Sequence, residues 1–333
     1  MMRMRIGILA LAAGAAAAAD PPDFTTLKHA KTLGDPSFRH AGTVTCLRAL
    51  PDGKRILSAA QDGTARLWDV ATRREIRRFS VEAGGDVWDV VPRPGRAEIL
   101  TAAEGGDVIR WDLDTGRELA RHKHPDTVFR IAGFPDGESF VATDSKGGAL
   151  RWAWDPGEPV KSYSIPKGSV YAVAVAGGGR TLITGGSDGK GPCWWNAATG
   201  DRLGFLSGLT GTVHTVALSP DGKAVAVCIE RQLAVLDPVS GAVTWVHTFD
   251  KEAYSCAWSP DGARLAVTSE ERVHLLGAAD GEPQASVRAG GGSSWGVAWS
   301  PDGATIFCGA GNGIAVVDVR SEEHTSELQS RQS

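Results

Sequence analysis

The chain has almost no excess charge of either sign. In 333 residues, 35 Lys and Arg stand against 39 Asp and Glu, so the formal net charge is −4. This balance leaves no basic surface of the kind that binds nucleic acid or an acidic membrane. After residue 20, no apolar run reaches the roughly 20 residues that a membrane-spanning helix needs. We therefore expect no nucleic-acid partner and no membrane span in the mature chain.

Cysteine is scarce, and its number is odd. Each Cys lies within an apolar, strand-like run, and no CxxC or CxxCH motif occurs. This pattern predicts small buried hydrophobic side chains rather than a disulfide framework, a structural zinc site or attached haem, although one disulfide stays open. The five residues are Cys46, Cys193, Cys228, Cys256 and Cys308.

Catalytic sequence motifs are missing as well. The chain contains no GxSxG, no HExxH, no P-loop, and no GxGxxG between a strand and a helix. The sequence therefore predicts a non-enzyme that holds no cofactor and no metal.

The N-terminus differs from the rest of the chain. Arg3 and Arg5 precede an Ala-rich apolar run, and small residues follow before Asp20. This order is typical of a secretory signal peptide, so residues 1–19 are expected to be cleaved and the protein exported to the periplasm or the medium. A short buried helix or a membrane anchor is the alternative.

An internal repeat organises the remainder. The tetrad SPDG and its variants recur at intervals of 40 to 43 residues. In each unit, one apolar strand precedes the turn and a second follows it. A third strand ends in an aromatic or aliphatic residue plus Asp, and a more polar fourth strand comes after. Short strands divided by Pro-Asp-Gly and Asp-Gly turns favour an all-β meander. The turn positions are Pro51, Pro94, Pro135, Gly177, Pro220, Pro260 and Pro301.

Period, turn and the strand-final Trp-Asp together resemble the WD40-repeat family. The first unit is the sharpest copy, with His40, Ser58, Asp62 and Trp68 at the spacing of that family's hydrogen-bonded tetrad. The fourth unit keeps a partial tetrad of Thr184, Asp188 and Trp194 without the His. The Trp of the last three units is replaced by Leu236, Leu276 and Val317.

The resemblance implies a seven-bladed β-propeller of four-stranded antiparallel blades over residues 20–319. The seventh unit supplies only three strands, and Phe24–Gly34 belongs to no other unit. This N-terminal segment is therefore expected to close the last blade as its outer strand, which removes an open sheet edge. The protein is expected to be a monomer.

Two groups of candidate ligand residues lie within this repeat. His122 and His124 could read as a metal-binding tract, but their place before the first strand of a unit matches that of His40, which favours a structural role. For channel chemistry, the sequence offers only His214, Asp86, Asp89 and Arg130.

Aromatic rings gather at one slot of the repeat, six residues before each turn position. Six of the seven slots hold a ring, although Phe, Trp and Tyr make up only 7% of the chain. In WD40 proteins this slot lies at the top mouth of the central channel and usually holds a small polar residue. The rings are Trp88, Phe129, Tyr171, His214, Tyr254 and Trp295, and Thr45 fills the seventh slot.

Two interpretations of these six residues, called here the aromatic collar, stay open. The rings could simply fill the wide end of the channel, or they could bind a protein, a peptide or a sugar. Flanking Asp86 and Glu252 make a cationic ligand conceivable. The leading hypothesis is a non-catalytic scaffold that binds a protein or peptide through the collar. The alternatives are a small-ligand binder or enzyme at the channel mouth, and the propeller part of a longer exported protein.

The last residues change character abruptly after Val319. Residues 320–333 are rich in charge and hydroxyl groups and contain no Val, Ile, Phe or Trp. Residues 320–330 match, position by position, the in-frame translation of a common short-read sequencing adapter. We expect this segment to be non-native and without packed structure, as an ordinary solvated tail would also be.

Overall fold

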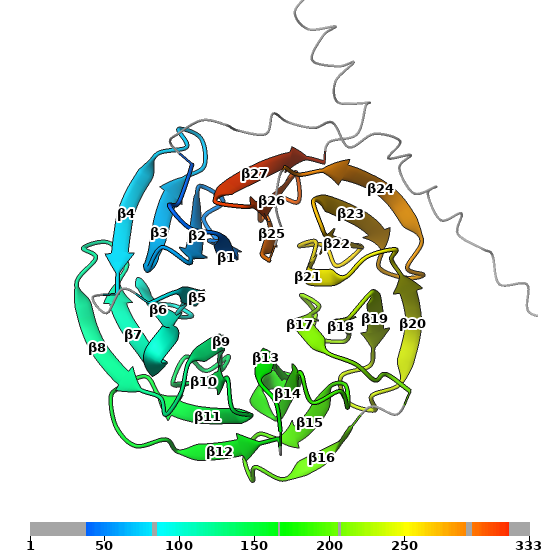
Figure 1. The fold of residues 1–333 in the computed structure, drawn as a ribbon, viewed down its shortest axis with the longest axis horizontal. Coiled ribbons are helices and arrows are strands. Elements are labelled where there is room, and N and C mark those ends of the chain that lie inside the picture. Colours follow the sequence, from blue (N-terminus) through cyan, green and yellow to red (C-terminus); the bar gives the residue numbers. More distant parts are fainter. Residues whose placement is uncertain (1–37, 82–84, 166, 206–207, 291–294, 320–333) are drawn as a thin grey trace, which may run out of the picture.

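The computed structural model describes residues 38–81, 85–165, 167–205, 208–290 and 295–319. In these ranges the chain forms seven antiparallel sheets set around a central axis (Figure 1). Six sheets have four strands and one has three. The only helical segments of the described part are two short 3-10 turns, η1 (Glu104–Gly106) and η2 (Gly177–Gly179). The predicted all-β, seven-bladed propeller is confirmed.

Each blade runs outward from the axis in chain order. The innermost strands are β1 (Val44–Ala49), β5 (Val87–Pro92), β9 (Val128–Gly133), β13 (Val170–Ala176), β17 (Val213–Leu218), β21 (Ala253–Trp258) and β25 (Val297–Trp299). The second strands are β2 (Arg55–Ala60), β6 (Glu98–Ala103), β10 (Ser139–Asp144), β14 (Thr181–Gly186), β18 (Val225–Ile229), β22 (Arg264–Ser269) and β26 (Thr305–Ala310).

The third strands are β3 (Thr64–Asp69), β7 (Asp107–Asp112), β11 (Gly148–Ala153), β15 (Cys193–Asn196), β19 (Gln232–Leu236), β23 (Arg272–Gly277) and β27 (Gly313–Asp318). The outer strands are β4 (Glu75–Ser80), β8 (Glu118–Lys123), β12 (Lys161–Ser164), β16 (Arg202–Phe205), β20 (Val243–Thr248) and β24 (Pro283–Arg288). We call the face at which the innermost strands begin the top face.

Burial explains why the second strands and the outer strands differ in amino-acid composition. The second strand β18 is buried at every residue and is a continuous apolar run, VAVCI. The outer strand β4 exposes most of its residues and is largely polar, EIRRFS. A strand covered on both faces needs apolar side chains throughout, whereas an outer strand needs them only on its covered face.

The Pro-Asp-Gly turns lie on the bottom face, between the first and second strands of a blade. In the first of them, Asp52 accepts hydrogen bonds from the amides of Lys54 and Arg55 at 2.9 and 3.1 Å. Gly53 has φ +67°, a left-handed conformation that glycine adopts without strain. The short turn keeps the two strands in register and makes the repeat visible in the sequence.

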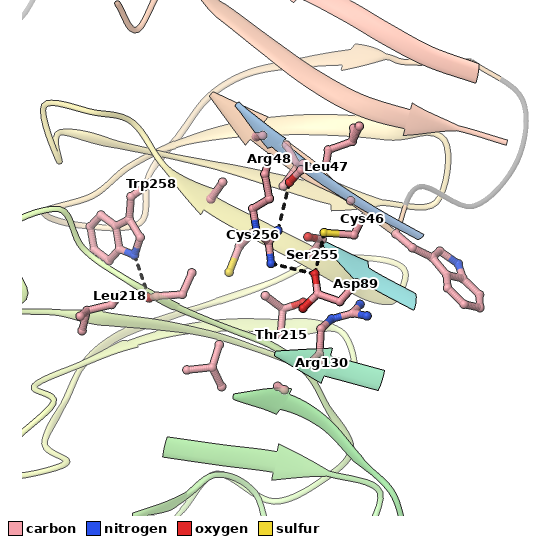
Figure 2. A pocket seen from close by; sticks show the side chains of 18 of the residues that line it. Cys46, Leu47, Arg48, Asp89, Arg130, Thr215, Leu218, Ser255, Cys256 and Trp258 are labelled. Carbon is pink, nitrogen blue, oxygen red and sulfur yellow. Dashed lines mark hydrogen bonds and ion pairs between the residues drawn. The ribbon is translucent and has the colours of Figure 1, made fainter. Parts of the chain in front are cut away.

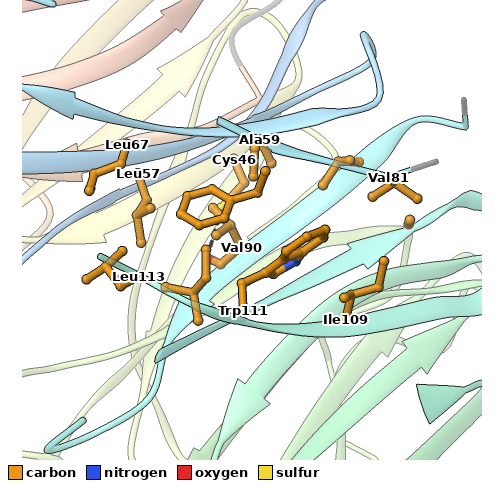
Figure 3. Close-up of a cluster of buried hydrophobic side chains, with 14 of the residues drawn as sticks. Cys46, Leu57, Ala59, Leu67, Val81, Val90, Ile109, Trp111 and Leu113 are labelled. Atoms are coloured by element: carbon orange, nitrogen blue, oxygen red, sulfur yellow. Dashed lines mark hydrogen bonds between the residues drawn. The ribbon is translucent and has the colours of Figure 1, made fainter. Parts of the chain in front are cut away.

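The core is divided among the contacts between neighbouring blades. One cluster joins the first and second blades and includes Phe79 and Trp111, whose ring centroids are 5.9 Å apart (Figure 3). A further cluster joins the first blade to the last, where Leu47 and Trp68 pack with Phe307 and Ile314. The ring is therefore closed by an apolar contact of the same kind as those between consecutive blades.

The approach to the first blade also touches the last one. The His40 amide donates to the Asn312 carbonyl at 2.8 Å, and Arg39 forms an isolated bridge with Gly313. The seventh sheet contains the three predicted strands of its own unit. The expected closing strand Phe24–Gly34, the signal peptide at residues 1–19 and the tail at residues 320–333 all lie outside the described residues.

All five cysteines are buried and free, as the sequence predicted. Burial raises the pKa of Cys46, Cys193 and Cys308 to about 12. Within the described ranges, no helix is long and apolar enough to cross a membrane.

Candidate functional site

The tetrad predicted in the first blade is hydrogen-bonded from end to end. The Trp68 indole N–H donates to Ser58 Oγ at 2.7 Å, and Ser58 Oγ lies 2.6 Å from His40 Nε2. On the other side of the imidazole, Nδ1 lies 3.0 Å from an oxygen of Asp62. His40, Ser58 and Trp68 are all buried, so these bonds satisfy polar atoms that water does not reach.

The protonation states of the tetrad fit this chain of bonds. Burial lowers the pKa of His40, although the hydrogen bond to Asp62 opposes the shift. Burial would raise the pKa of Asp62, but hydrogen bonds from His40, Thr64 and the Ala41 amide hold it well below its usual range. A neutral imidazole that donates a hydrogen bond from Nδ1 to Asp62 can accept a hydrogen bond from the Ser58 hydroxyl at Nε2.

In the fourth blade, the partial tetrad predicted from the sequence contains the wrong tryptophan. The Trp195 indole, not that of Trp194, donates to Thr184 Oγ1 at 2.8 Å. Trp194 points to the other side of β15 and donates to the Pro238 carbonyl at 2.9 Å. The reason is register: Trp195 pairs with Leu182, two residues before Thr184, just as Trp68 pairs with Ile56, two residues before Ser58.

Asp188 does not join that bond either. Its Oδ1 accepts the Lys190 amide at 3.1 Å, and its Oδ2 is buried without a hydrogen-bond partner among the described residues. A signal for the correct tryptophan was present in the sequence. Asn196 follows Trp195 and accepts turn amides from Ala198 and Thr199, the role that Asp69 plays after Trp68.

The other blades fill the same position in different ways. In the second, Trp111 donates to Thr101 Oγ1 at 2.9 Å. In the third, Ala142 occupies the hydroxyl position, and the Trp152 indole nitrogen is buried without a hydrogen-bond partner among the described residues. In the last three blades, the fully buried aliphatic side chains Leu236, Leu276 and Val317 replace the indole.

Of the two histidines of the predicted structural tract, His122 lies on β8, the outer strand of the second blade, and His124 follows it in the connection to β9. Both rings contact Trp152 of the third blade. His124 Nδ1 is 3.5 Å from Asp144, which matches the place of His40 beside Asp62. His122 packs edge-on against Phe140, with ring centroids 5.1 Å apart, and Nε2 lies 3.3 Å from the Trp154 carbonyl. Within the described residues, no group of three or more His, Cys, Asp or Glu is arranged to hold a metal ion.

The slot of the aromatic collar corresponds to a β-bulge. In each of the first six blades, the pairing of the innermost strand skips one residue, and the skipped residue is the one in the slot. A bulged residue stands outside the ladder, and its side chain is turned away from the direction that regular pleating would give it. The skipped residues are Thr45, Trp88, Phe129, Tyr171, His214 and Tyr254.

The six collar rings line one pocket at the top face, called here the mouth pocket. Its volume is about 550 Å³, and Arg130, Ser187 and Thr212 complete its lining. The Trp88 ring stacks on that of Trp295 with centroids 5.9 Å apart and meets the Phe129 ring edge-on at 5.3 Å. The contacts continue from Phe129 to Tyr171 at 5.3 Å, and His214 meets Tyr254 at 5.5 Å.

All six collar rings are half-buried, and none is fully enclosed. Thr45 differs because it is fully buried, donates to the Val87 carbonyl at 2.7 Å and does not line the mouth pocket. Burial lowers the pKa of His214, although Glu252 lies 4.0 Å from its Nε2. Burial and the same carboxylate raise the pKa of Tyr254. Both rings are therefore uncharged near neutral pH.

A second pocket of about 390 Å³ lies among the innermost strands; we call it the channel pocket. Figure 2 shows Asp89 in it beside Cys46, Arg48 and Arg130. Asp89 is fully buried and accepts hydrogen bonds from Cys46 Sγ at 2.8 Å and Arg48 Nη2 at 3.2 Å. Its other oxygen accepts the Ile131 amide at 2.9 Å. Arg48 was not among the residues predicted from the sequence, although a signal was present. Three residues before the turn position, the second unit has Val91 and the other five have Ala, so Arg48 is the exception at this place.

Arg130 lines both pockets. Its Nη1 donates to the backbone carbonyls of Trp88 and Phe129 at 3.0 and 2.8 Å. Of the other residues considered for channel chemistry, His214 lies in the mouth pocket, Asp89 in the channel pocket, and Asp86 accepts a bond from Gln61 at 2.9 Å. No hydrogen bond or ion pair in the described part of the chain joins any two of these four residues.

Comparison with known proteins gives local matches. The family model described as WD40, "WD domain, G-beta repeat", matches residues 35–69 and 157–194. The chain is 33% identical over 86 residues to eukaryotic translation initiation factor 3 subunit I of Aspergillus fumigatus, which is 26% of this chain and 25% of that protein. It is 27% identical over 95 residues to a p21-activated protein kinase-interacting protein 1-like protein of Danio rerio, 28% of this chain and 26% of that protein. The chain thus spans about a quarter of the length of the curated relatives it matches.

Proposed function

Because this chain folds as a seven-bladed propeller and matches the WD40 family model at residues 35–69 and 157–194, we propose that it is a non-catalytic interaction module whose top face binds a protein or peptide through the aromatic collar. The observation that carries the proposal is that six rings from six blades line a single pocket. Aromatic side chains bring a large contact area at a small cost in conformational entropy, and they are enriched at the centres of protein interfaces.

The state of the rings favours binding over simple filling of the channel. Rings that served only to plug the channel would be enclosed by one another, like Trp68 or Phe140 in the core. The collar rings instead keep part of their surface open around a pocket whose volume is within the range of ordinary ligand sites. The printed names of the two relatives, a subunit of an initiation factor and a kinase-interacting protein, also fit a role in protein association.

The proposal is tested by capture experiments with the propeller and a collar variant. Immobilised wild-type protein is compared with the double variant Trp88→Ala plus Trp295→Ala in retaining proteins from the source organism. We expect the wild type to retain a partner that the double variant loses. Trp245→Ala, on outer strand β20 and away from the mouth pocket, is the matched control and should retain the partner. Equal retention by the wild type and the collar variant would contradict the proposal.

A small-ligand binder in the channel is the second candidate. The observation in its favour is the polar group of Arg48, Asp89 and Arg130 in the channel pocket. The carboxylate of Asp89 is engaged by four donors, the fourth being the Val90 amide at 3.0 Å, so it is poorly placed to act as a base. This polar group therefore supports binding better than catalysis.

Export is a separate proposal that rests on the N-terminal sequence alone. Expression of the full chain in a bacterial host, followed by N-terminal sequencing of the periplasmic fraction, tests it. We expect a mature protein that begins near residue 20. A chain that keeps Met1 and stays in the cytosolic fraction would overturn the proposal.

A further inference from the structure

We propose, building on the function above, that the mouth pocket binds the C-terminal residue of its peptide partner. In this arrangement an apolar or aromatic side chain of the last residue packs against the collar rings, and the α-carboxylate pairs with the guanidinium of Arg130. The proposal adds the chemistry of the partner to the proposed interaction surface.

Arg130 is the first ground for this inference. Of the nine residues that line the mouth pocket, it alone carries a permanent charge. Within the described residues, Arg130 forms no ion pair, and its only hydrogen bonds are donated by Nη1 to the carbonyls of Trp88 and Phe129. Its Nε and Nη2 groups are therefore left to donate to a ligand. A guanidinium offers parallel N–H groups whose geometry matches the two oxygens of a carboxylate.

The neighbouring carboxylate does not take this role. Asp89 is fully buried and accepts from Arg48, from the Cys46 thiol and from two backbone amides. The polar group in the channel pocket thus combines two guanidinium groups with one carboxylate, which Arg48 already engages. The charge that remains is positive and lies beneath uncharged rings, so it favours an anion at the base of the mouth pocket.

The acidic groups at the rim do not reverse this preference. The Glu252 side chain is 51% exposed and lies beside His214, so water and salt screen its charge. Arg130 is partly buried among apolar rings, where a charge is screened less. A cation that entered the pocket would meet Arg130, which argues against the cationic ligand that the sequence left open.

The position of the pocket at the centre of the top face favours a chain end. An internal loop that reached Arg130 would have to enter and leave between the same rings. It would therefore need room for two chain segments side by side, and paired extended segments lie about 4.8 Å apart. A C-terminal residue enters once and places its carboxylate deepest. Capture of a terminal carboxylate is one of the recurring modes of peptide recognition.

The test measures the affinity of three capped peptides for the full protein by isothermal titration calorimetry. The first is acetyl-Ala-Leu-Phe with a free carboxylate, and the second is the same peptide with a C-terminal amide. The third, acetyl-Glu-Leu-Phe amide, carries its carboxylate on a side chain. We expect the free acid to bind about tenfold more tightly than either amide, as the loss of a charge-assisted hydrogen bond implies.

Three variants connect this preference to the residues. Arg130→Gln keeps a donor for the Trp88 and Phe129 carbonyls but removes the charge, so it should abolish the preference for the acid without changing the affinity for the amide. Arg130→Lys should retain part of the preference. Trp88→Ala should weaken all three peptides. Circular dichroism melting shows whether each variant is folded.

Equal affinity for acid and amide, no binding of either, or an acid preference that survives Arg130→Gln would overturn the inference. Tighter binding of the side-chain carboxylate would overturn the assignment to a chain end. If the collar variant loses a captured partner while no peptide shows an acid preference, the proposed function stands and only this inference fails.

Discussion

At the scale of single residues, the fate of a buried indole N–H distinguishes the blades. The first, second and fourth blades place a Ser or Thr hydroxyl 2.7 to 2.9 Å from the Trp nitrogen. The third blade offers Ala142, and the Trp152 N–H has no hydrogen-bond partner among the described residues. Since a buried donor without a partner costs free energy, the third blade is less well stabilised at this point than its neighbours.

Ser58→Ala should destabilise the protein by about 1–3 kcal/mol, because it leaves both the Trp68 N–H and His40 Nε2 without a partner in a site that water does not reach. Chemical denaturation measured by tryptophan fluorescence gives the change in unfolding free energy. A loss below about 0.5 kcal/mol, the range of ordinary surface substitutions, would show that the tetrad contributes little.

Ala142→Ser should act in the opposite direction, with a gain of about 1 kcal/mol, because the new hydroxyl can accept the Trp152 N–H. The same substitution in a Trp152→Phe background has no N–H to satisfy, so there the gain should disappear. A gain that persists in the Phe background would assign the effect to another cause.

The residues at the tetrad positions could be predicted only where the alignment of the unit with the repeat was unambiguous. His40, Ser58, Asp62 and Trp68 could be named because one Trp stands before one Asp. In the fourth blade two tryptophans are adjacent and Asn196 replaces Asp, so counting placed the indole one residue too early. A shift of one residue moves a side chain to the opposite face of a strand, which is why Trp194 and Trp195 have unrelated partners.

At the scale of the strand, the bulge gives neighbouring residues different roles. The paired residues form the sheet, and the skipped residue carries the side chain that lines the mouth pocket. Counting back from the turn found Trp88, Phe129 and Tyr171 in the sequence. It could not show that the pairing of the first six innermost strands skips that residue, because a bulge leaves the residue count of the repeat unchanged. The convergence of the rings on one pocket therefore became visible only in the structure.

Two tyrosines give a direct comparison of these kinds of position. Tyr163→Ala should cost about 3–5 kcal/mol, because Tyr163 is 1% exposed, packs edge-on against Trp195 and donates to the Ala197 carbonyl at 2.6 Å. Tyr171→Ala, at a half-buried bulge, should cost about 1 kcal/mol. Urea titrations of both variants test the difference, and equal losses would contradict the assignment of Tyr171 to the pocket rather than the core.

At the scale of the whole molecule, stability resides in the contacts between blades. The cluster of Phe38, Leu47 and Trp68 with Phe307 joins the first and last blades across the greatest distance in sequence. The repeat predicted this closure, since seven units complete a ring. Local sequence did not identify the residues that form this contact. The sequence pattern around a residue at one end of the chain does not indicate which residue from the other end packs against it.

Stability should fall as the pH drops from about 6.5 to about 4. Burial lowers the pKa of His40, His122, His124 and His214 in the folded protein. Burial, aided by the neighbouring Arg272 and His247, lowers the pKa of His274 to about 4. An unfolded His titrates near 6.5, so between these values the unfolded chain binds more protons and becomes favoured.

Thermal melting between pH 7.5 and pH 4.5 measures this loss as a falling melting temperature. His274→Gln removes one titrating group and should make the decline shallower. A melting temperature that is constant or rises on acidification would contradict the expected direction.

The bulge in the innermost strands of the first six blades has one more consequence. Because the five collar side chains on these strands stand outside the ladder, such a ring can be exchanged for another residue without altering the hydrogen bonds that hold the blade. Thr45 already shows that a small residue is accommodated at this place in the first blade. The side chains that line the mouth pocket can therefore vary while the strand pairing of the blades stays the same. New ligand preferences can be engineered or evolve there with little loss of folding stability.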